Sequence, residues 1–280
     1  MKKMNYKHFF KNNLLRKISE ITTFRQYPIW IDGASFTLAG TEFFMTHNPE
    51  DLKRLQTTEE RFLLGKTRNL VTNTVAMRDS ESIKQIVDIG IYKGGSIALY
   101  ALLFSPLKLV GIEYSTEPVE PLDKFITKNG LRRQVSTYYG VNQADSKRLI
   151  QIVDAEFGGV QLDLVIDDAS HYYAETRSSF ETLFPMLRPG GIYIIEDWGW
   201  AHWAGDEWQN SKYFPASSPS LTNLLIEISM LCASRPDLVA SLQVEHSVIT
   251  VRRGNAQFEA EEFKLEQQYL NRGNKFEPII

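Results

Sequence analysis

A chain of 280 residues, 43% hydrophobic and 23% charged, has the composition of a folded globular protein, which excludes disordered and fibrous classes. Lys and Arg number 31 against 34 Asp and Glu, so the net charge of −3 gives no general attraction to nucleic acid or to an anionic membrane. The single cysteine, Cys232, excludes an intramolecular disulfide and a thiolate zinc cluster. The sequence has no apolar run long enough to span a membrane, so we expect a cytoplasmic protein that acts on a small molecule.

Residues 1–80 show no regular alternation of strands and helices, and we predict a helical extension or cap that could build a homo-oligomer. A solvated helix face or arm explains the basic residues from Lys2 to Lys17 better than nucleic-acid binding does. Apolar residues with helical spacing begin after Asn48: Leu52, Leu55, Phe62, Leu63, Leu70 and Val71. Gly65-Lys66-Thr67 ends like a phosphate-binding loop, but Glu60 replaces its first glycine and no strand is predicted before it. We therefore treat that match as accidental.

Residues 81–254 change to short apolar runs separated by helix-sized segments. The predicted strands are 83–89, 109–112, 135–139, 162–166 and 192–195. Continuous apolarity is typical of parallel strands covered on both faces, so the segment predicts a doubly wound α/β domain. An apolar helix around 221–232 and a hairpin formed by 242–244 and 248–251 complete it, and residues 255–280 form a tail without a predicted structure.

The segment 87–96, V-D-I-G-I-Y-K-G-G-S, joins the first predicted strand to a helix. Glycines let the backbone turn sharply and approach a ligand, but a dinucleotide fingerprint would need glycine at Tyr92. The pattern resembles instead the S-adenosylmethionine site of class I methyltransferases, with an aspartate for an ammonium group and an acid after the next strand for the ribose hydroxyls. The residues concerned are Asp88, Gly90, Gly94, Ser96 and Glu113. The alternative is a turn followed by an unrelated surface acid.

Two acidic pairs, Asp167-Asp168 and Glu196-Asp197, each follow a predicted strand directly. Carboxylates that converge at one edge repel one another unless a cation neutralises them, and oxygen ligands suit Mg²⁺ or Ca²⁺. We predict that Asp168, Glu196 and Asp197 hold Mg²⁺, that Asp167 points inward, and that His171 is a general base. Asp168 could instead cap the next helix. Side chains that point apart, or a lysine or arginine between the carboxylates, would contradict the cation.

The segment from Asp167 to Trp198, with S-F-E-T-L-F-P at 179–185 and P-G-G at 189–191, resembles the metal-dependent sugar O-methyltransferases of macrolide tailoring. Rhamnosyl O-methyltransferases and cephalosporin hydroxylases are also similar. The resemblance covers about residues 83–203 and implies a Rossmann-like, mostly parallel seven-stranded sheet, S-adenosylmethionine, and Mg²⁺ that chelates adjacent hydroxyls of a glycosylated or polyhydroxylated secondary metabolite. Related sequences carry an acid near the adenine, a place that Gln143 or Asp145 would have to fill here.

Four of the five tryptophans follow the second acidic pair, at positions 198, 200, 203 and 208. They could stack on a sugar ring or form a cap against the N-terminal extension, and His202 among them is a rival base. A hydroxylase or oxidoreductase on the same scaffold, and a non-catalytic cofactor-binding subunit, are the alternative functions. Tyr92 disfavours a nicotinamide cofactor, and the intact set of acids with His171 disfavours a non-catalytic role.

Overall fold

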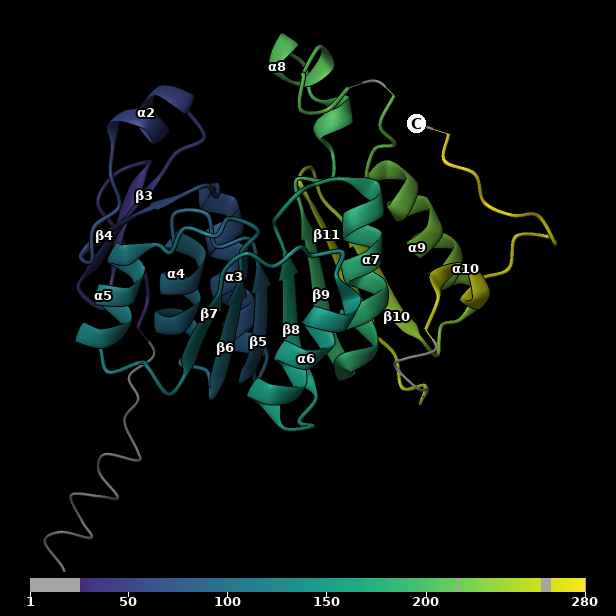
Figure 1. Ribbon diagram of the computed structural model, residues 1–280, viewed down its shortest axis with the longest axis horizontal. Coiled ribbons are helices and arrows are strands. Elements are labelled where there is room, and N and C mark those ends of the chain that lie inside the picture. The colour runs from purple at the N-terminus through teal and green to yellow at the C-terminus, as the bar shows by residue number, and fades with distance from the viewer. Residues whose placement is uncertain (1–25, 216, 258–262, 280) are drawn as a thin grey trace, which may run out of the picture.

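The computed structural model describes residues 26–215, 217–257 and 263–279, which form two sheets flanked by helices (Figure 1). The larger sheet has seven strands in the order β10-β11-β9-β8-β5-β6-β7, and β11 is antiparallel to both of its neighbours. The bounds are β5 Gln85–Ile89, β6 Lys108–Ile112, β7 Val135–Tyr138, β8 Leu162–Asp167, β9 Leu187–Glu196, β10 Val239–Val244 and β11 Val248–Arg253. The other neighbouring pairs are parallel. The predicted doubly wound sheet and its edge hairpin are confirmed.

Helices cover both faces of this sheet. They are α3 Arg68–Ser80, α4 Gly95–Phe104, α5 Glu120–Lys128, α6 Ser146–Phe157, α7 Tyr173–Leu183, α9 Thr222–Ser234 and α10 Leu265–Gln268, with short helical turns η1 Phe184–Met186, η2 Trp200–His202 and α8 Asp206–Gln209. Along β8, Val165 packs into the core under α6, α7 and α9, and Leu164 into the core under α4 and α5. Burial on both faces explains the continuous apolar runs. Within the described ranges, no helix has the length and apolarity to cross a membrane.

The prediction of a helical N-terminal extension is wrong for much of its length, and the predicted arm at 2–17 lies outside the described residues. A four-stranded sheet precedes α3, with strands β1 Ile29–Trp30, β2 Ser35–Leu38, β3 Thr41–Met45 and β4 Arg61–Leu64, and the short helix α2 Pro49–Arg54. Burial alternates along β3, as expected for a strand with one buried face. Strand β4 also supplies the strand that was not predicted before Gly65-Lys66-Thr67, and the Thr67 side chain caps α3 by accepting a hydrogen bond from the Leu70 N–H.

Aromatic packing and a backbone contact attach this small sheet to the large domain. The Phe62 ring on β4 lies 5.2 Å, centroid to centroid, from the Phe125 ring on α5. Gly95, the first residue of α4, approaches the β4 backbone so closely that a Cβ atom would lie 2.2 Å from the Leu63 carbonyl oxygen. The carboxyl end of β4, and with it Lys66, is thereby held beside the glycine-rich turn.

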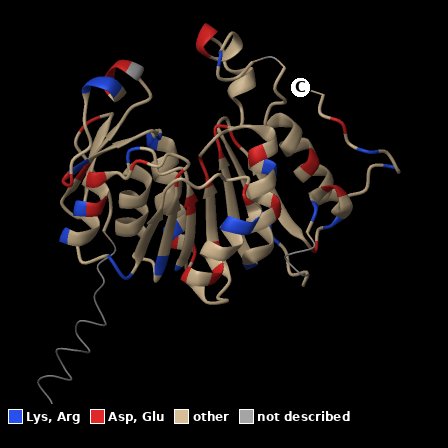
Figure 2. Cartoon of the chain, in the orientation of Figure 1, with Lys and Arg blue, Asp and Glu red and all other residues tan. Residues whose placement is uncertain are grey.

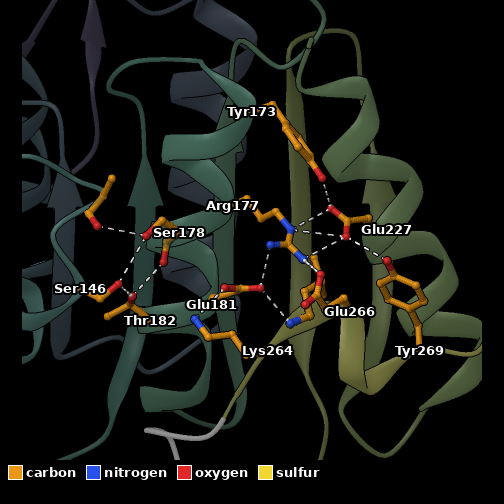
Figure 3. Close-up of polar contacts among 12 residues, drawn as sticks. Ser146, Tyr173, Arg177, Ser178, Glu181, Thr182, Glu227, Lys264, Glu266 and Tyr269 are labelled. Atoms are coloured by element: carbon orange, nitrogen blue, oxygen red, sulfur yellow. Dashed lines mark hydrogen bonds and ion pairs between the residues drawn. The ribbon is translucent and has the colours of Figure 1, made fainter. Parts of the chain in front are cut away.

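A polar network holds helix α7 against helix α9 (Figure 3). The buried Glu227 carboxylate on α9 accepts hydrogen bonds from the Tyr173 hydroxyl at 2.7 Å and the Tyr269 hydroxyl at 3.0 Å, and pairs with Arg177 at 3.1 Å. Because a buried charge is tolerated only when it is paired and hydrogen-bonded, this network holds α7 rigidly against α9. Helix α7 begins two residues after His171, so the network also anchors the site described next.

We expect Gly95→Ala to destabilise the protein by about 1–3 kcal/mol, because the new methyl group would overlap the Leu63 carbonyl and push β4 away from α4. Chemical denaturation measures the change. Gly33→Ala is the matched control, since a Cβ atom at Gly33 meets nothing within 4 Å. Equal stability of the two variants would contradict the close packing of β4 against α4.

Candidate metal and cofactor site

A cavity of about 910 Å³ lies beyond the carboxyl ends of the central parallel strands, where ligands bind in open α/β sheets. Figure 2 shows acidic segments at this end of the large sheet. Eight of the predicted site residues line the cavity: Gly90, Ser96, Glu113, Gln143, Asp168, His171, Glu196 and Asp197. The predicted residues Asp88 and Gly94 lie outside its lining, Asp88 fully buried and Gly94 with a left-handed backbone at the N-cap of α4. The sequence therefore located the cavity and most of its acidic lining.

The glycine-rich turn and Glu113 form one side of the cavity. Gly90 has φ +107°, and a Cβ atom there would lie 2.0 Å from the Asp168 carbonyl oxygen. Only glycine fits this position without a shift of the backbone. Glu113 follows β6, and its two carboxylate oxygens accept hydrogen bonds from the backbone N–H groups of Tyr92 at 2.8 Å and Ser115 at 2.9 Å. Each oxygen keeps a second lone pair, so the fixed carboxylate can still accept from a ribose hydroxyl.

Asp88 on β5 is completely buried, and neither carboxylate oxygen finds a hydrogen-bond partner among the described residues. Burial raises the pKa of Asp88 to about 7, and the Lys66 charge and the nearby Ser96 hydroxyl act against that rise. A buried carboxyl group without a partner is costly, and such groups call for a ligand or a functional reason. A cationic ligand in the neighbouring cavity would favour the charged form.

Gln143 and Asp145, the two candidates for the adenine contact, have structural partners. The Gln143 side-chain oxygen accepts from the Ser170 N–H at 2.9 Å, and its nitrogen donates to Asp167 at 3.2 Å. Asp145 caps α6 by accepting from the Arg148 N–H at 3.0 Å. Gln143 thus holds the segment that carries Asp168 and His171, and an adenine contact stays a prediction.

The acidic segments after β8 and β9 meet as expected. Ligand atoms of Asp168, His171 and Asp197 all lie within 4.8 Å of one another, which is close enough for one ion. The His171 Nε2 atom is 4.0 Å from Asp168 Oδ1. Asp167 points inward and accepts from Tyr193 at 3.0 Å and from Ser179. Both His171, at φ +57°, and Asp197, at φ +52°, have left-handed backbones, a strained conformation for residues other than glycine that clusters at functional sites.

Lys66, which the sequence analysis set aside, lies between two of these carboxylates. Its Nζ atom is 2.6 Å from both Glu196 oxygens and 3.1 Å from Asp168 Oδ2, and its side chain is 2% exposed. A lysine between the carboxylates is the observation that the sequence analysis set against the cation, and Lys66 meets that condition for Glu196 and for one oxygen of Asp168. Within the part of the chain that the structure describes, no lysine or arginine pairs with Asp197, so a cation stays a prediction for the group of Asp168, Asp197 and His171. No local pattern could reveal the contacts of Lys66, since its partners are 102 and 130 residues away in sequence.

The protonation of this cluster follows from its geometry. Burial alone would lower the pKa of Lys66, but Asp168 and Glu196 raise it well above its usual range. Burial raises the pKa of Glu196 to about 8, whereas Lys66 lowers it. The Lys66 ammonium group donates to both Glu196 oxygens. A proton on either oxygen would point at one of these N–H donors, so we assign a charged lysine paired with a charged glutamate. Burial would also raise the pKa of Asp168, but Lys66 and His171 hold it below its usual range.

The four tryptophans after β9 occupy different positions. Trp203 and Trp208 line the cavity and contact each other at 4.8 Å, centroid to centroid. Trp200 is buried, and its indole N–H donates to the His171 carbonyl oxygen at 3.0 Å. The rival base His202 does not line the cavity, and its ring nitrogen lies 2.7 Å from Thr222 Oγ1. Trp203 and Trp208 therefore face the cavity, whereas Trp200 supports the backbone of His171, and the Trp198 indole N–H donates to the Glu245 carbonyl oxygen at 2.8 Å.

The strand order, with its reversed strand β11 beside the edge strand, defines the fold of the class I methyltransferases. Residues 87–198 match the model of a family described as a methyltransferase domain. This segment holds the glycine-rich turn, both acidic pairs and His171. The resemblance to sugar O-methyltransferases that the motifs indicated is confirmed by the relatives below.

The chain is 33% identical over 128 residues, 43% of its length, to mycinamicin VI 2''-O-methyltransferase of Micromonospora griseorubida. It is 44% identical over 62 residues, 22% of its length, to 8-demethyl-8-alpha-L-rhamnosyl tetracenomycin-C 2'-O-methyltransferase of Streptomyces olivaceus. These matches span only 29% and 16% of the two relatives. The solved structure of the MycE methyltransferase from the mycinamycin pathway with Mg, SAH and mycinamycin VI is similar with a TM-score of 0.47 and 26% identity, over 67% of this chain and 49% of that one.

We expect Asp88→Asn to stabilise the ligand-free protein at pH 8, by about 2–4 kcal/mol, and to change it little at pH 4. Burial raises the pKa of Asp88 to about 7 in the folded protein, whereas the unfolded chain loses this proton near pH 4, so stability is lost as the pH rises from about 4 to 7. Denaturant unfolding at the two pH values measures the difference. Asp145→Asn, which exchanges one good N-cap residue for another, is the control. A pH-independent effect of Asp88→Asn would contradict the buried charge.

Proposed function

We propose that this protein is an S-adenosylmethionine-dependent O-methyltransferase that methylates a sugar hydroxyl of a glycosylated metabolite. The divalent cation that we propose for the reaction is Mg²⁺. The observation that carries the proposal is the meeting of Asp168, Asp197 and His171 at the ligand edge of a methyltransferase sheet, beside a large cavity. The acceptor class is supported by relatives whose names specify methylation of sugar hydroxyls on natural products.

The cavity fits the cofactor on three grounds. Asp88, buried without a hydrogen-bond partner among the described residues, supplies negative potential for the methionine ammonium and the sulfonium, although it lies below the lining. Glu113, fixed by the N–H groups of Tyr92 and Ser115, is oriented to accept from the ribose hydroxyls. Gly90 keeps the floor of the cavity free of a side chain. S-adenosylmethionine would supply a methyl group on a positively charged sulfur.

The donor set also fits Mg²⁺. Carboxylate oxygens are the protein ligands that this ion prefers, and it is commonly bound by one or two carboxylates together with water and substrate oxygens. Asp168 Oδ1 and Asp197 present such oxygens at the rim. A divalent cation there would act as a Lewis acid on the acceptor hydroxyl.

The remaining steps belong to residues of this chain. His171 Nε2 would accept the proton of the acceptor hydroxyl, because it is adjacent to the rim and its backbone is held by Trp200. Trp203 and Trp208 would orient the sugar by contact with its apolar face. Most of the rate gain would come from the alignment of the hydroxyl oxygen with the methyl carbon and sulfur.

The proposed function is tested by calorimetry and by methyl transfer. S-adenosylmethionine and its demethylated product should bind, and NAD should not. Transfer to a glycoside with two adjacent free hydroxyls should stop on chelation and return with Mg²⁺, and a deoxy analogue lacking one hydroxyl should be a poorer acceptor. Binding of NAD in place of S-adenosylmethionine would refute the cofactor, and activity that survives chelation would refute the metal.

We expect His171→Ala to lower kcat by about 10²–10⁴-fold while cofactor affinity stays nearly unchanged, because the lost group acts on the proton and not on the cofactor. Steady-state kinetics and calorimetry measure the two effects. His202→Ala is the matched control, since that ring lies outside the cavity lining. If His202→Ala is the more damaging change, the base is His202.

A further inference from the structure

Lys66 is the feature of the site that the proposed function leaves unused. It follows β4 of the small N-terminal sheet, and it enters the acidic rim of the large sheet with its side chain only 2% exposed. It lines the same cavity as Asp168, Glu196 and Asp197. Its ammonium group contacts both Glu196 oxygens and one Asp168 oxygen, so it is part of the site and not of the surface.

We propose that Lys66 is the resident counter-ion of Glu196, so that Glu196 is not a metal ligand in this chain and a divalent cation is held by Asp168 and Asp197 alone. The inference rests on the proposed function for the presence of the cation. It revises the set of three carboxylates expected from the sequence. It also assigns the N-terminal sheet a direct part in the site, because the small sheet delivers the lysine.

The contacts support this division of the carboxylates. Both Glu196 oxygens lie 2.6 Å from Nζ, so an ion bound to Glu196 would have to displace an ammonium group or lie against it. Two cations at such a separation repel each other strongly in a buried site. Asp168 is bound to Lys66 through Oδ2 at 3.1 Å, whereas its Oδ1 faces His171 at 4.0 Å and is open to an ion. The grouping of Asp168 with His171 and Asp197 does not include Glu196.

A site with two carboxylates suits the proposed reaction. An octahedral Mg²⁺ ion with two protein ligands keeps four positions for water and for two acceptor oxygens, and it commonly binds in this way at substrate sites. Lys66 meanwhile neutralises a buried glutamate that would otherwise be strongly destabilising. The lysine therefore stabilises the buried Glu196 carboxylate whether or not the cation is present.

The test uses Mn²⁺ as the probe and measures free Mn²⁺ by electron paramagnetic resonance during titration of the full chain. The main variant is the double substitution Lys66→Met with Glu196→Gln, which removes one positive and one negative charge together. We expect its Kd for Mn²⁺ to rise by no more than about threefold, because Glu196 supplies no ligand and the loss of Lys66 leaves both Asp168 oxygens free for the ion. Asp197→Asn, the ligand control, should weaken binding by at least about tenfold. Glu196→Gln alone is unsuitable here, because it would leave an unneutralised lysine beside the ion.

A loss of affinity larger than about threefold in the double variant would overturn the proposal. So would a crystal structure of the Mn²⁺ complex that shows a Glu196 oxygen bound to the ion with Lys66 displaced. The supporting result places Mn²⁺ at Asp168 and Asp197, with Nζ still hydrogen-bonded to Glu196.

A thermal-unfolding cycle in the presence of a chelator separates this inference from the proposed function. Lys66→Met should lower Tm, and adding Glu196→Gln to that variant should raise it again, because the unpaired carboxylate is removed. Glu196→Gln should lower Tm when Lys66 is present. The same change of Tm in both backgrounds would refute the pair. If wild-type protein binds no Mn²⁺, the metal of the proposed function fails, and this cycle still decides whether Lys66 and Glu196 are paired.

Discussion

The ion pair of Lys66 with Glu196 and Asp168 is the interaction on which the rest of the site depends. The carboxyl ends of parallel strands bring Asp88, Asp168 and Glu196 together in a largely buried region. Removing such charges from water costs several kcal/mol each, and only a close opposite charge offsets that cost. The lysine comes from a different sheet, so the large sheet alone does not contain a neutralised rim. The small sheet is therefore part of the site electrostatically, although the matched methyltransferase segment begins at residue 87.

Two glycines make this arrangement sterically attainable. In the sequence, the glycines of the segment 87–96 predicted a turn that brings the backbone close to a ligand, and Gly90 and Gly94 were named as its site residues. In the structure, two glycines of this segment also bring the backbone close to protein: Gly90 approaches the Asp168 carbonyl, and Gly95 approaches the Leu63 carbonyl. The first contact sets the position of the acidic segment after β8, and the second sets the end of β4 that carries Lys66. A single glycine-rich turn thus determines how the two charged segments meet, before any ligand is considered.

The sequence predicted those parts of the molecule whose signal is local. Strands that are buried on both faces appear in the sequence as apolar runs, and these runs predicted the fold. The acids at the ends of β8 and β9 lie at the same edge of a parallel sheet, and this position predicted the acidic rim of the cavity. The small sheet was missed because short strands such as Arg61–Leu64 carry too few residues to separate a period of two from a helical period. Lys66 was missed for a different reason, since its role exists only through partners more than a hundred residues away. Asp88 was predicted as a ligand contact, whereas the structure places it beneath the cavity.

The charges of the rim also bear on where a cationic cofactor can be held. Lys66 neutralises Glu196, and the divalent cation proposed for Asp168 and Asp197 would neutralise those two carboxylates. Asp88 is then the carboxylate of this cluster that remains beside the cavity, buried and outside its lining. Because burial raises the pKa of Asp88 to about 7, a cationic ligand close to it would favour its charged form. The acidic residues therefore fall into two groups with different tasks, since those at the rim would face cations at the acceptor side and Asp88 would face the positively charged cofactor.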